Sequence, residues 1–219
     1  MRVIHIPCES IYDPIPTLSD NISELRQYSS LIVVATSQHL RAMAAVVDHL
    51  NANGIKARSG GQVLGCDPSA AAGTEDAVLH IGSGRFHPLG IARAEKKPVH
   101  ILNPLSNVLD LVSADEIEKL EKKRKGAITA ALSHDVFGIM VSTKNGQNHL
   151  DAALRLKAKM AAHGKRAYII AGEELSPPNV LPFSVQMLVN TACPRIADDS
   201  YHVPVINLAD MEAALVLLE

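Results

Sequence analysis

Aromatic residues and cysteines are scarce in this sequence, and tryptophan is missing. Only 3% of the 219 residues are aromatic, so the core must be built from Val, Ile, Leu and Ala, a composition that suits buried parallel strands covered by alanine-rich helices. The three cysteines, Cys8, Cys66 and Cys193, lie far apart. An odd number of widely separated cysteines argues against a disulfide framework and leaves metal binding, catalysis or burial as their role.

The sequence also lacks a strong net charge and a long apolar run. The formal net charge is -2, which gives little electrostatic attraction to nucleic acid or to an anionic membrane. No uninterrupted apolar segment approaches the roughly 20 residues of a membrane span, and no basic segment followed by an apolar stretch opens the chain. We therefore expect a cytoplasmic protein that binds neither nucleic acid nor membranes.

Strand and helix patterns alternate along the chain and restart near its middle. Strands are predicted over residues 2–6, 31–35, 55–58, 77–81, 99–102, 136–141, 167–171, 187–189 and 203–206. Helices are predicted over residues 19–28, 39–51, 114–132, 148–162 and 208–218. Residues 103–112 are expected to cross between the two halves, and Pro177 and Pro178 argue against a helix start before Asn179.

This alternation predicts an α/β fold of two similar units, each with a parallel-rich sheet flanked by helices. The first unit is expected over residues 1–107 and the second over residues 108–219. Ligands of such sheets gather at the carboxyl ends of the strands.

Two of the cysteines follow predicted strands instead of lying inside them. Cys66 stands between Gly65 and Asp67 in a glycine-flanked turn, and Cys193 is followed by Pro194 and Arg195. Plain burial, the commonest role of a cytosolic cysteine, fits these positions badly. A nearby arginine stabilises the thiolate, which is the form that binds metal or attacks a substrate. We expect both cysteine turns to lie at the carboxyl ends of strands.

The spacing of the cysteines favours one metal centre over another. No C-x-x-C pair, H-E-x-x-H motif or zinc-knuckle spacing occurs, so a structural zinc site has weak support. Three thiolates from distant positions suit an iron-sulfur cluster better, and three ligands on a four-iron cluster leave one iron open to a substrate. Cys8 is as plausible a packing residue as a third ligand.

Two polar loops complete the candidate site. Residues 82–90 form a glycine-rich loop in which Arg85 could clamp a carboxylate and His87 could contact a substrate, with a plain surface turn as the alternative. Residues 142–147 are assigned the matching place in the second unit. Lys144 and Gln147 there are candidate contacts to an anionic small molecule.

Four segments together resemble the archaeal-type diphthamide synthase family: residues 61–66, 81–90, 141–147 and 190–197. The resemblance implies a homodimer of three-domain chains in which each domain gives one cysteine to a central 4Fe-4S cluster. The open iron then binds S-adenosylmethionine, and the reduced cluster cleaves its bond between sulfur and the methionine γ-carbon. The resulting 3-amino-3-carboxypropyl radical adds to a histidine of translation elongation factor 2.

The same resemblance assigns roles to individual residues. Cys66 and Cys193 become the cluster ligands of the family's second and third domains. The side chains implied to line the site for the charged amino-acid end of the cofactor are Arg85, His87, Lys144, Gln147 and Arg195. The chain begins where the second domain is expected to begin, so the first domain and its cysteine are expected to be absent.

Several interpretations remain open at this point. Cys8 aligns with the opening strand of the second domain, yet its thiol could still converge with the other two, or another chain could donate the third ligand. The leading hypothesis is a 3-amino-3-carboxypropyl transferase that acts on elongation factor 2 or another protein, as a homodimer or with a related chain. The alternatives are a non-catalytic subunit that completes or supports the cluster of a diphthamide synthase-like partner, and a metal-free α/β binding protein.

Overall fold

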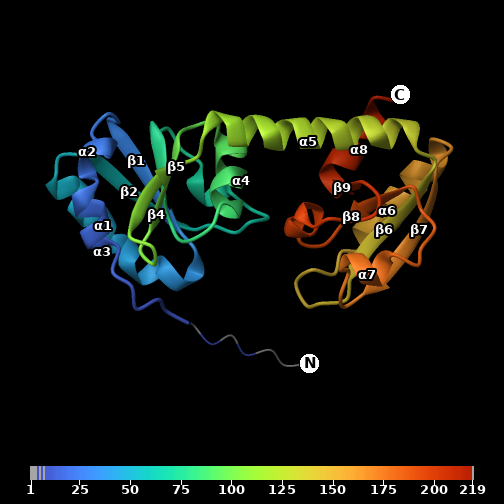
Figure 1. Cartoon of the computed structure of the whole chain (residues 1–219), viewed down its shortest axis with the longest axis horizontal. Helices are drawn as coiled ribbons and strands as arrows, with labels where there is room; N and C mark the ends of the chain where they lie inside the picture. The colour runs from blue at the N-terminus through green and yellow to red at the C-terminus, as the bar shows by residue number, and fades with distance from the viewer. Residues whose placement is uncertain (1–3, 5, 7, 219) are drawn as a thin grey trace. The chain divides into compact units, whose positions relative to one another are not determined.

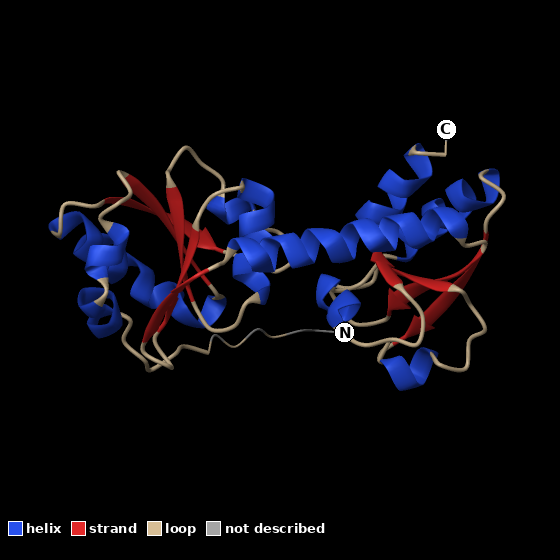
Figure 2. Cartoon of the chain, turned by 45° about the horizontal axis from the view of Figure 1, so that its top comes forward, coloured by secondary structure: helices blue, strands red, loops and turns tan. Residues whose placement is uncertain are grey.

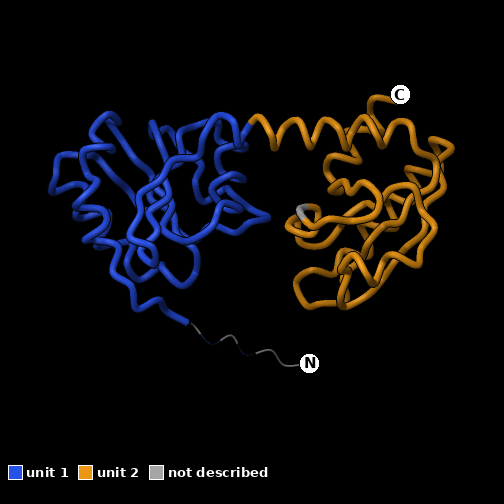
Figure 3. The backbone as a smooth tube through the Cα atoms, viewed as in Figure 1, with its two compact units in different colours: residues 1–117 blue, residues 118–219 orange. Residues whose placement is uncertain are grey.

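The computed structural model describes residue 4, residue 6 and residues 8–218, with only the backbone of residue 198. The chain divides into two compact units, Met1–Ile117 and Glu118–Glu219 (Figure 3). Each unit has a parallel-rich sheet with helices on both faces (Figures 1 and 2). The predicted α/β class is therefore confirmed.

The first unit is built on a five-stranded sheet of order β2-β1-β3-β4-β5, in which β5 alone runs antiparallel to its neighbour. Its strands are β1 (Ser30–Ala35), β2 (Lys56–Gln62), β3 (Ala77–Ile81), β4 (Val99–Asn103) and β5 (Val108–Leu111). Its helices are α1 (Ile15–Asp20), α2 (Ile22–Leu25), α3 (Met43–Ala52) and α4 (Phe86–Glu95), with 3₁₀ helices η1 (Ser37–Ala42) and η2 (Ser69–Ala71). Helices α1 to α3 cover one face, and α4 and η2 cover the other.

The second unit is built on a fully parallel four-stranded sheet of order β7-β6-β8-β9. Its strands are β6 (Val136–Ser142), β7 (Arg166–Gly172), β8 (Met187–Asn190) and β9 (Val205–Asn207). Its helices are α5 (Ala114–Ser133), which begins in the first unit, α6 (Leu150–Ala162), α7 (Pro177–Val180), α8 (Leu208–Val216) and the 3₁₀ helix η3 (Pro194–Asp198). Helices α5, α6 and α8 pack on one face, and α7 and η3 pack on the other (Figure 2).

Alternation of side chains along the strands produces these two-sided cores. In β1, Leu31 and Val33 pack beneath α1 to α3, whereas Ile32 and Val34 pack toward α4. All four are fully buried, as expected for an interior parallel strand covered on both faces.

The strand order creates a topological switch point in each unit. The chain passes from β1 outward to β2 and then returns past β1 to β3, and it repeats this course from β6 to β7 and back to β8. The crevices at the carboxyl ends of β1 and β3, and of β6 and β8, are therefore the places where sheets of this kind bind ligands.

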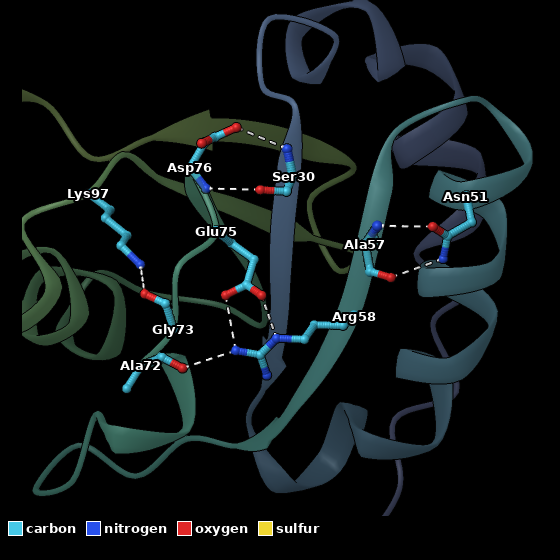
Figure 4. A network of polar contacts seen from close by, with 9 residues as sticks. All are labelled: Ser30, Asn51, Ala57, Arg58, Ala72, Gly73, Glu75, Asp76 and Lys97. Atoms are coloured by element: carbon cyan, nitrogen blue, oxygen red, sulfur yellow. Dashed lines mark hydrogen bonds and ion pairs between the residues drawn. The ribbon is translucent and has the colours of Figure 1, made fainter.

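Polar contacts fix the start of β2, the strand that leads to Cys66 (Figure 4). The Arg58 guanidinium donates to both carboxylate oxygens of Glu75, from Nε at 2.5 Å and from Nη2 at 3.0 Å, and Nη2 also donates to the carbonyl of Ala72 at 3.1 Å. The Asn51 amide pairs with the N–H and the carbonyl of Ala57, both at 3.0 Å. These contacts tie edge strand β2 to α3 on one side and to the segment before β3 on the other.

Three local predictions differ from the structure. Most of the predicted strand 2–6 lies outside the described residues, while Ile4 and Ile6 are not in a strand and are each 84% exposed. Residues 103–112 are not a crossover, because they contain β5, which turns back beside β4 in the first unit. Helix α7 begins at Pro177 and not after it, since proline lacks only an N–H that the first turn of a helix leaves unused.

Candidate functional site

Cys66 lies at the tip of a tight hairpin just after β2. Leu64 and Asp67 exchange two backbone hydrogen bonds of 3.2 and 3.1 Å, so Gly65 and Cys66 form the two-residue turn. The side chain and backbone N–H of Ser69 lower the pKa of Asp67, with the side chain contributing more. The thiol of Cys66 is free, and the residue is exposed.

The loop after β3 supports this hairpin. A Cβ atom at Gly65 would overlap the ring of Phe86, so only glycine lets the turn lie this close to the ring. Phe86 is the first residue of α4 and contacts the ring of His87 edge-on, with centroids 5.5 Å apart. The structure thus brings the Cys66 turn against the loop that carries Arg85 and His87.

Two carboxylates engage Arg85. Its Nη2 lies 2.5 Å from Asp110 Oδ2, and its Nε lies 3.3 Å from Glu116 Oε1. Hydrogen bonds from Ser113, first from its backbone N–H and then from its hydroxyl, lower the pKa of Glu116, and the charge of Arg85 adds to this effect. Because the Arg85 side chain is 40% exposed, these ion pairs are weak enough for an anionic ligand to compete with them.

His87 stacks on His80, a fully buried histidine in the middle of the sheet. The two rings are 5.9 Å apart and nearly parallel. Neither ring nitrogen of His80 has a hydrogen-bond partner among the described residues, and the same holds for Thr36 Oγ1 and His39 Nδ1. Burial, followed by the charges of His87 and His39, lowers the pKa of His80 to about 3. His80 is therefore neutral at physiological pH.

Cys193 lies between β8 and η3 in the second unit, and the residue is half-buried with a free thiol. It lines a hollow of about 190 Å³. The other side chains that line this hollow include Ser142, Lys144, Gln147, Glu173, Glu174 and Tyr201. The structure therefore brings together Cys193, Lys144 and Gln147, while Arg195, which follows Pro194 in the sequence, is exposed in η3.

Acidic residues of this hollow escaped the sequence reasoning. Glu173 and Glu174 follow β7, and Asp199 follows η3, so no short motif connects them with Cys193. A basic and an acidic group in one hollow can recognise a zwitterion, since Lys144 can bind a carboxylate while a glutamate binds an ammonium group. The position of Glu173 directly after a parallel strand is the one signal that could have identified it.

The expected match between corresponding loops of the two units is wrong. By strand order, β2 corresponds to β7 and β3 corresponds to β8, so Cys66 and Cys193 leave strands that do not correspond. The loop 82–90 follows β3 and corresponds to the Cys193 turn, and the loop 142–147 follows β6 and corresponds to the segment after β1. The cysteine turns and the polar loops are therefore similar in local sequence but occupy different positions in the two sheets.

The donor set suits an iron-sulfur cluster in its chemistry. Cys66 and Cys193 are unpaired thiols on turns at strand ends, and Cys193 opens into a hollow. Cys8 is free and exposed, and no strand precedes it among the described residues. Within the described part of the chain, no group of three or more His, Cys, Asp or Glu side chains gathers to hold a metal ion. Nor does any helix there have the length and apolarity needed to cross a membrane.

The fold and the site define an α/β protein that presents free thiols at the carboxyl ends of two parallel-rich sheets. A family model described as "Putative diphthamide synthesis protein" matches residues 1–219. The chain therefore belongs to the diphthamide synthesis protein family, and the predicted resemblance is confirmed.

Individual relatives agree with this assignment. The 2-(3-amino-3-carboxypropyl)histidine synthase of Pyrococcus horikoshii is 31% identical and aligns with 99% of this chain and 66% of its own length. The synthase of the same name from Methanocaldococcus jannaschii is 36% identical over 64% of this chain and 41% of its own length. The chain thus spans less than two thirds of both relatives.

Solved structures match the fold as well. The crystal structure of Dph2 from Pyrococcus horikoshii superposes with a TM-score of 0.89 at 30% identity, covering 96% of this chain and 65% of that one. A second crystal structure of the same protein, with a 4Fe-4S cluster, gives a TM-score of 0.88 and covers 97% and 65% of the two chains.

Proposed function

We propose that this chain takes part in transferring a 3-amino-3-carboxypropyl group from S-adenosylmethionine to a histidine of a protein acceptor. The observation that carries the proposal is the family match over residues 1–219, which includes both turn-borne cysteines. The names of the archaeal relatives and the cluster in the Pyrococcus horikoshii structure support it. The proposed acceptor is translation elongation factor 2, and because a translation factor works in the cytoplasm, the proposal locates the reaction there.

Cys66 and Cys193 are the proposed ligands of a 4Fe-4S cluster. The third ligand is Cys8 or a thiol of another chain, which is either a second copy in a homodimer or a related subunit. When bound and reduced, such a cluster supplies the electron that cleaves the bond between sulfur and the methionine γ-carbon. Each ligand position requires an unpaired thiol, and all three cysteines are free.

The hollow beside Cys193 is the proposed site for the amino-acid end of S-adenosylmethionine. Lys144 would bind the carboxylate and Gln147 would donate its amide, while Glu173 or Glu174 would bind the ammonium group. Arg195, directly after Pro194, would add positive charge near the thiolate. In the first unit, Arg85 and His87 are the proposed contacts, with Arg85 exchanging Asp110 for a ligand carboxylate.

Anaerobic reconstitution followed by iron and sulfide counting tests the cluster. We expect wild-type protein to take up a cluster and Cys66→Ala or Cys193→Ala to lose most of the iron, because each variant removes one of few thiolate ligands. A Cys66→Ala or Cys193→Ala variant that keeps a full cluster contradicts the proposal.

Cys8→Ala serves as the matched variant. Loss of iron in Cys8→Ala assigns the third ligand to Cys8, and retained iron assigns it to another chain. Cleavage of S-adenosylmethionine by the purified protein alone then separates catalysis from a purely supporting subunit. Transfer of label from the cofactor to elongation factor 2, or its absence, tests the acceptor.

A further inference from the structure

The side-chain amide of Asn190 ties together the turn that carries Cys193. Asn190 is the last residue of β8 and is 2% exposed. Its Nδ2 donates to the carbonyl of Cys193 at 2.9 Å and to Oδ1 of Asn207 at 2.8 Å, and its Oδ1 accepts from the N–H of Ala192 at 3.0 Å. A backbone N–H only donates and a carbonyl only accepts, so these partners determine how the amide is oriented.

The rest of the turn is anchored on both sides of these bonds. The Thr191 hydroxyl donates to the carbonyl of Met140 in β6 at 2.7 Å, and the Thr191 N–H approaches the same oxygen at 3.2 Å. After Cys193, Pro194 begins η3, where its fixed φ suits the first position. Between these anchors, the Cys193 carbonyl accepts from both the Asn190 amide and the N–H of Ile196, the latter at 3.0 Å, while the N–H of Ala192 donates to Asn190.

We propose that Asn190 is a positioning residue that fixes the direction of the Cys193 thiol. By accepting from the N–H of Ala192, the residue before Cys193, and donating to the carbonyl of Cys193 itself, the amide restrains the backbone on both sides of the residue that carries the thiol. Asparagine is suited to this because it offers a donor and an acceptor on one short side chain, whereas aspartate offers only acceptors and leucine offers neither. The proposal rests on the proposed function where it concerns iron, but its effect on the thiol does not.

The first experiment measures the alkylation rate of each cysteine by iodoacetamide in metal-free protein, by mass spectrometry of the peptides. We expect Cys193 to react about fivefold faster in Asn190→Ala, which corresponds to losing about 1 kcal/mol of hydrogen bonding. Cys66 in the same molecules is the internal control and is expected to keep its wild-type rate.

Asn207→Ala is the matched variant for a merely structural role. It removes the bond between the two asparagines but leaves Asn190 bound to Cys193 and Ala192. We expect Cys193 to react at the wild-type rate in Asn207→Ala. This difference from Asn190→Ala is expected even if the two variants have the same thermal unfolding midpoint. Equal acceleration in both variants, or none in Asn190→Ala, overturns the proposal.

A second measurement needs no variant and stands even if Asn190→Ala fails to fold. The backbone N–H of Ala192 is expected to exchange slowly with deuterium in wild-type protein, because it donates to a buried side chain. Exchange as fast as in an exposed loop overturns the proposal.

The third measurement extends the test to the cluster. In reconstituted protein, Asn190→Ala is expected to lose iron to a chelator several-fold faster than Asn207→Ala, with a changed electron paramagnetic resonance signal after reduction. If wild-type protein takes up no cluster, the proposed function fails while the alkylation and exchange results still decide the role of Asn190. If wild-type takes up a cluster and all three proteins behave alike, the positioning role fails alone.

Discussion

The ends of β3 and β8 occupy corresponding places in the two units, but they bury different polar groups there. His80 of β3 and Asn190 of β8 both face the helix that follows their strand. The Asn190 amide makes three hydrogen bonds, with Cys193, Ala192 and Asn207, whereas neither ring nitrogen of His80 has a partner among the described residues. At the end of β8, a hydrogen-bonded amide supports the turn that carries a thiol. Near the end of β3, a buried imidazole has no hydrogen-bond partner among the described residues.

This difference indicates how the same architecture supports its cysteines in two ways. In the second unit, the loop after the switch-point strand carries Cys193 itself. In the first unit, the corresponding loop carries no cysteine and instead supports the Cys66 hairpin of β2 through Phe86. The orientation of one thiol thus depends on a side-chain amide, and that of the other depends on ring packing.

Acidification is expected to have the largest effect on the comparison, because it destabilises the end of β3 and not the end of β8. The folded pKa of His80, about 3, lies below its ordinary value of 6.5, so between these values the unfolded chain binds more protons and stability falls as pH falls. Lowering the pH from 7 to 5 is expected to reduce the free energy of unfolding by about 2 kcal/mol through His80 alone. Burial also lowers the pKa of His39 and of His100, which adds to the effect in the same unit.

Hydrogen exchange in the full chain measures this effect in each unit. After correction for the intrinsic pH dependence of exchange, the β3 peptide is expected to lose protection at pH 5 relative to the β8 peptide. His80→Leu, which removes the titrating ring, is expected to reduce that loss. Equal changes in β3 and β8 in the wild-type protein would show that His80 does not control acid sensitivity.

Substitution of Gly65 is expected to have the next largest effect, since it breaks the packing between the Cys66 turn and the loop after β3. In Gly65→Ala, the new Cβ overlaps the Phe86 ring and costs about 1–2 kcal/mol, in the lower part of the overpacking range because Phe86 is only half-buried and can shift. Urea unfolding measures the cost, and iodoacetamide measures a changed rate at Cys66 with an unchanged rate at Cys193.

Gly90→Ala is the control in the same unit. Gly90 lies in α4, and apart from its chain neighbours and the backbone of its own helix no atom lies within 4 Å of the position that a Cβ atom would take there, so alanine is expected to be neutral or stabilising. If Gly65→Ala were as harmless as Gly90→Ala, Phe86 would not be what supports the Cys66 turn.

Sequence reasoning identified the local features of this site better than its assembly. The positions of Cys66 and Cys193 after strands are visible because apolar runs end in glycine or proline, and Lys144 and Gln147 follow a strand in the same way. The partners of Arg85 could not be predicted from the sequence. Asp110 lies in β5, whose antiparallel pairing with β4 no pattern in residues 103–112 indicates, and Glu116 lies in the following helix α5. Strand order likewise depends on long-range packing, which local sequence does not reveal. The two similar cysteine turns therefore suggested equivalent positions, although Cys66 follows β2 and Cys193 follows β8, and these strands do not correspond.

The smallest expected effect comes from two threonines that follow switch-point strands, Thr36 after β1 and Thr191 after β8. Thr191 Oγ1 donates to the carbonyl of Met140 at 2.7 Å, whereas Thr36 Oγ1 is buried with no partner among the described residues. Thr191→Val is therefore expected to cost about 1 kcal/mol, because it removes a hydrogen bond and leaves the Met140 carbonyl only the weaker contact from the Thr191 N–H. Thr36→Val replaces an unsatisfied hydroxyl with a methyl group of similar shape and is expected to be neutral or stabilising. Urea unfolding of the two variants compares a strand end whose threonine hydroxyl is hydrogen-bonded with one whose hydroxyl has no partner among the described residues. Equal destabilisation by both substitutions would contradict this difference between the switch points of the two units.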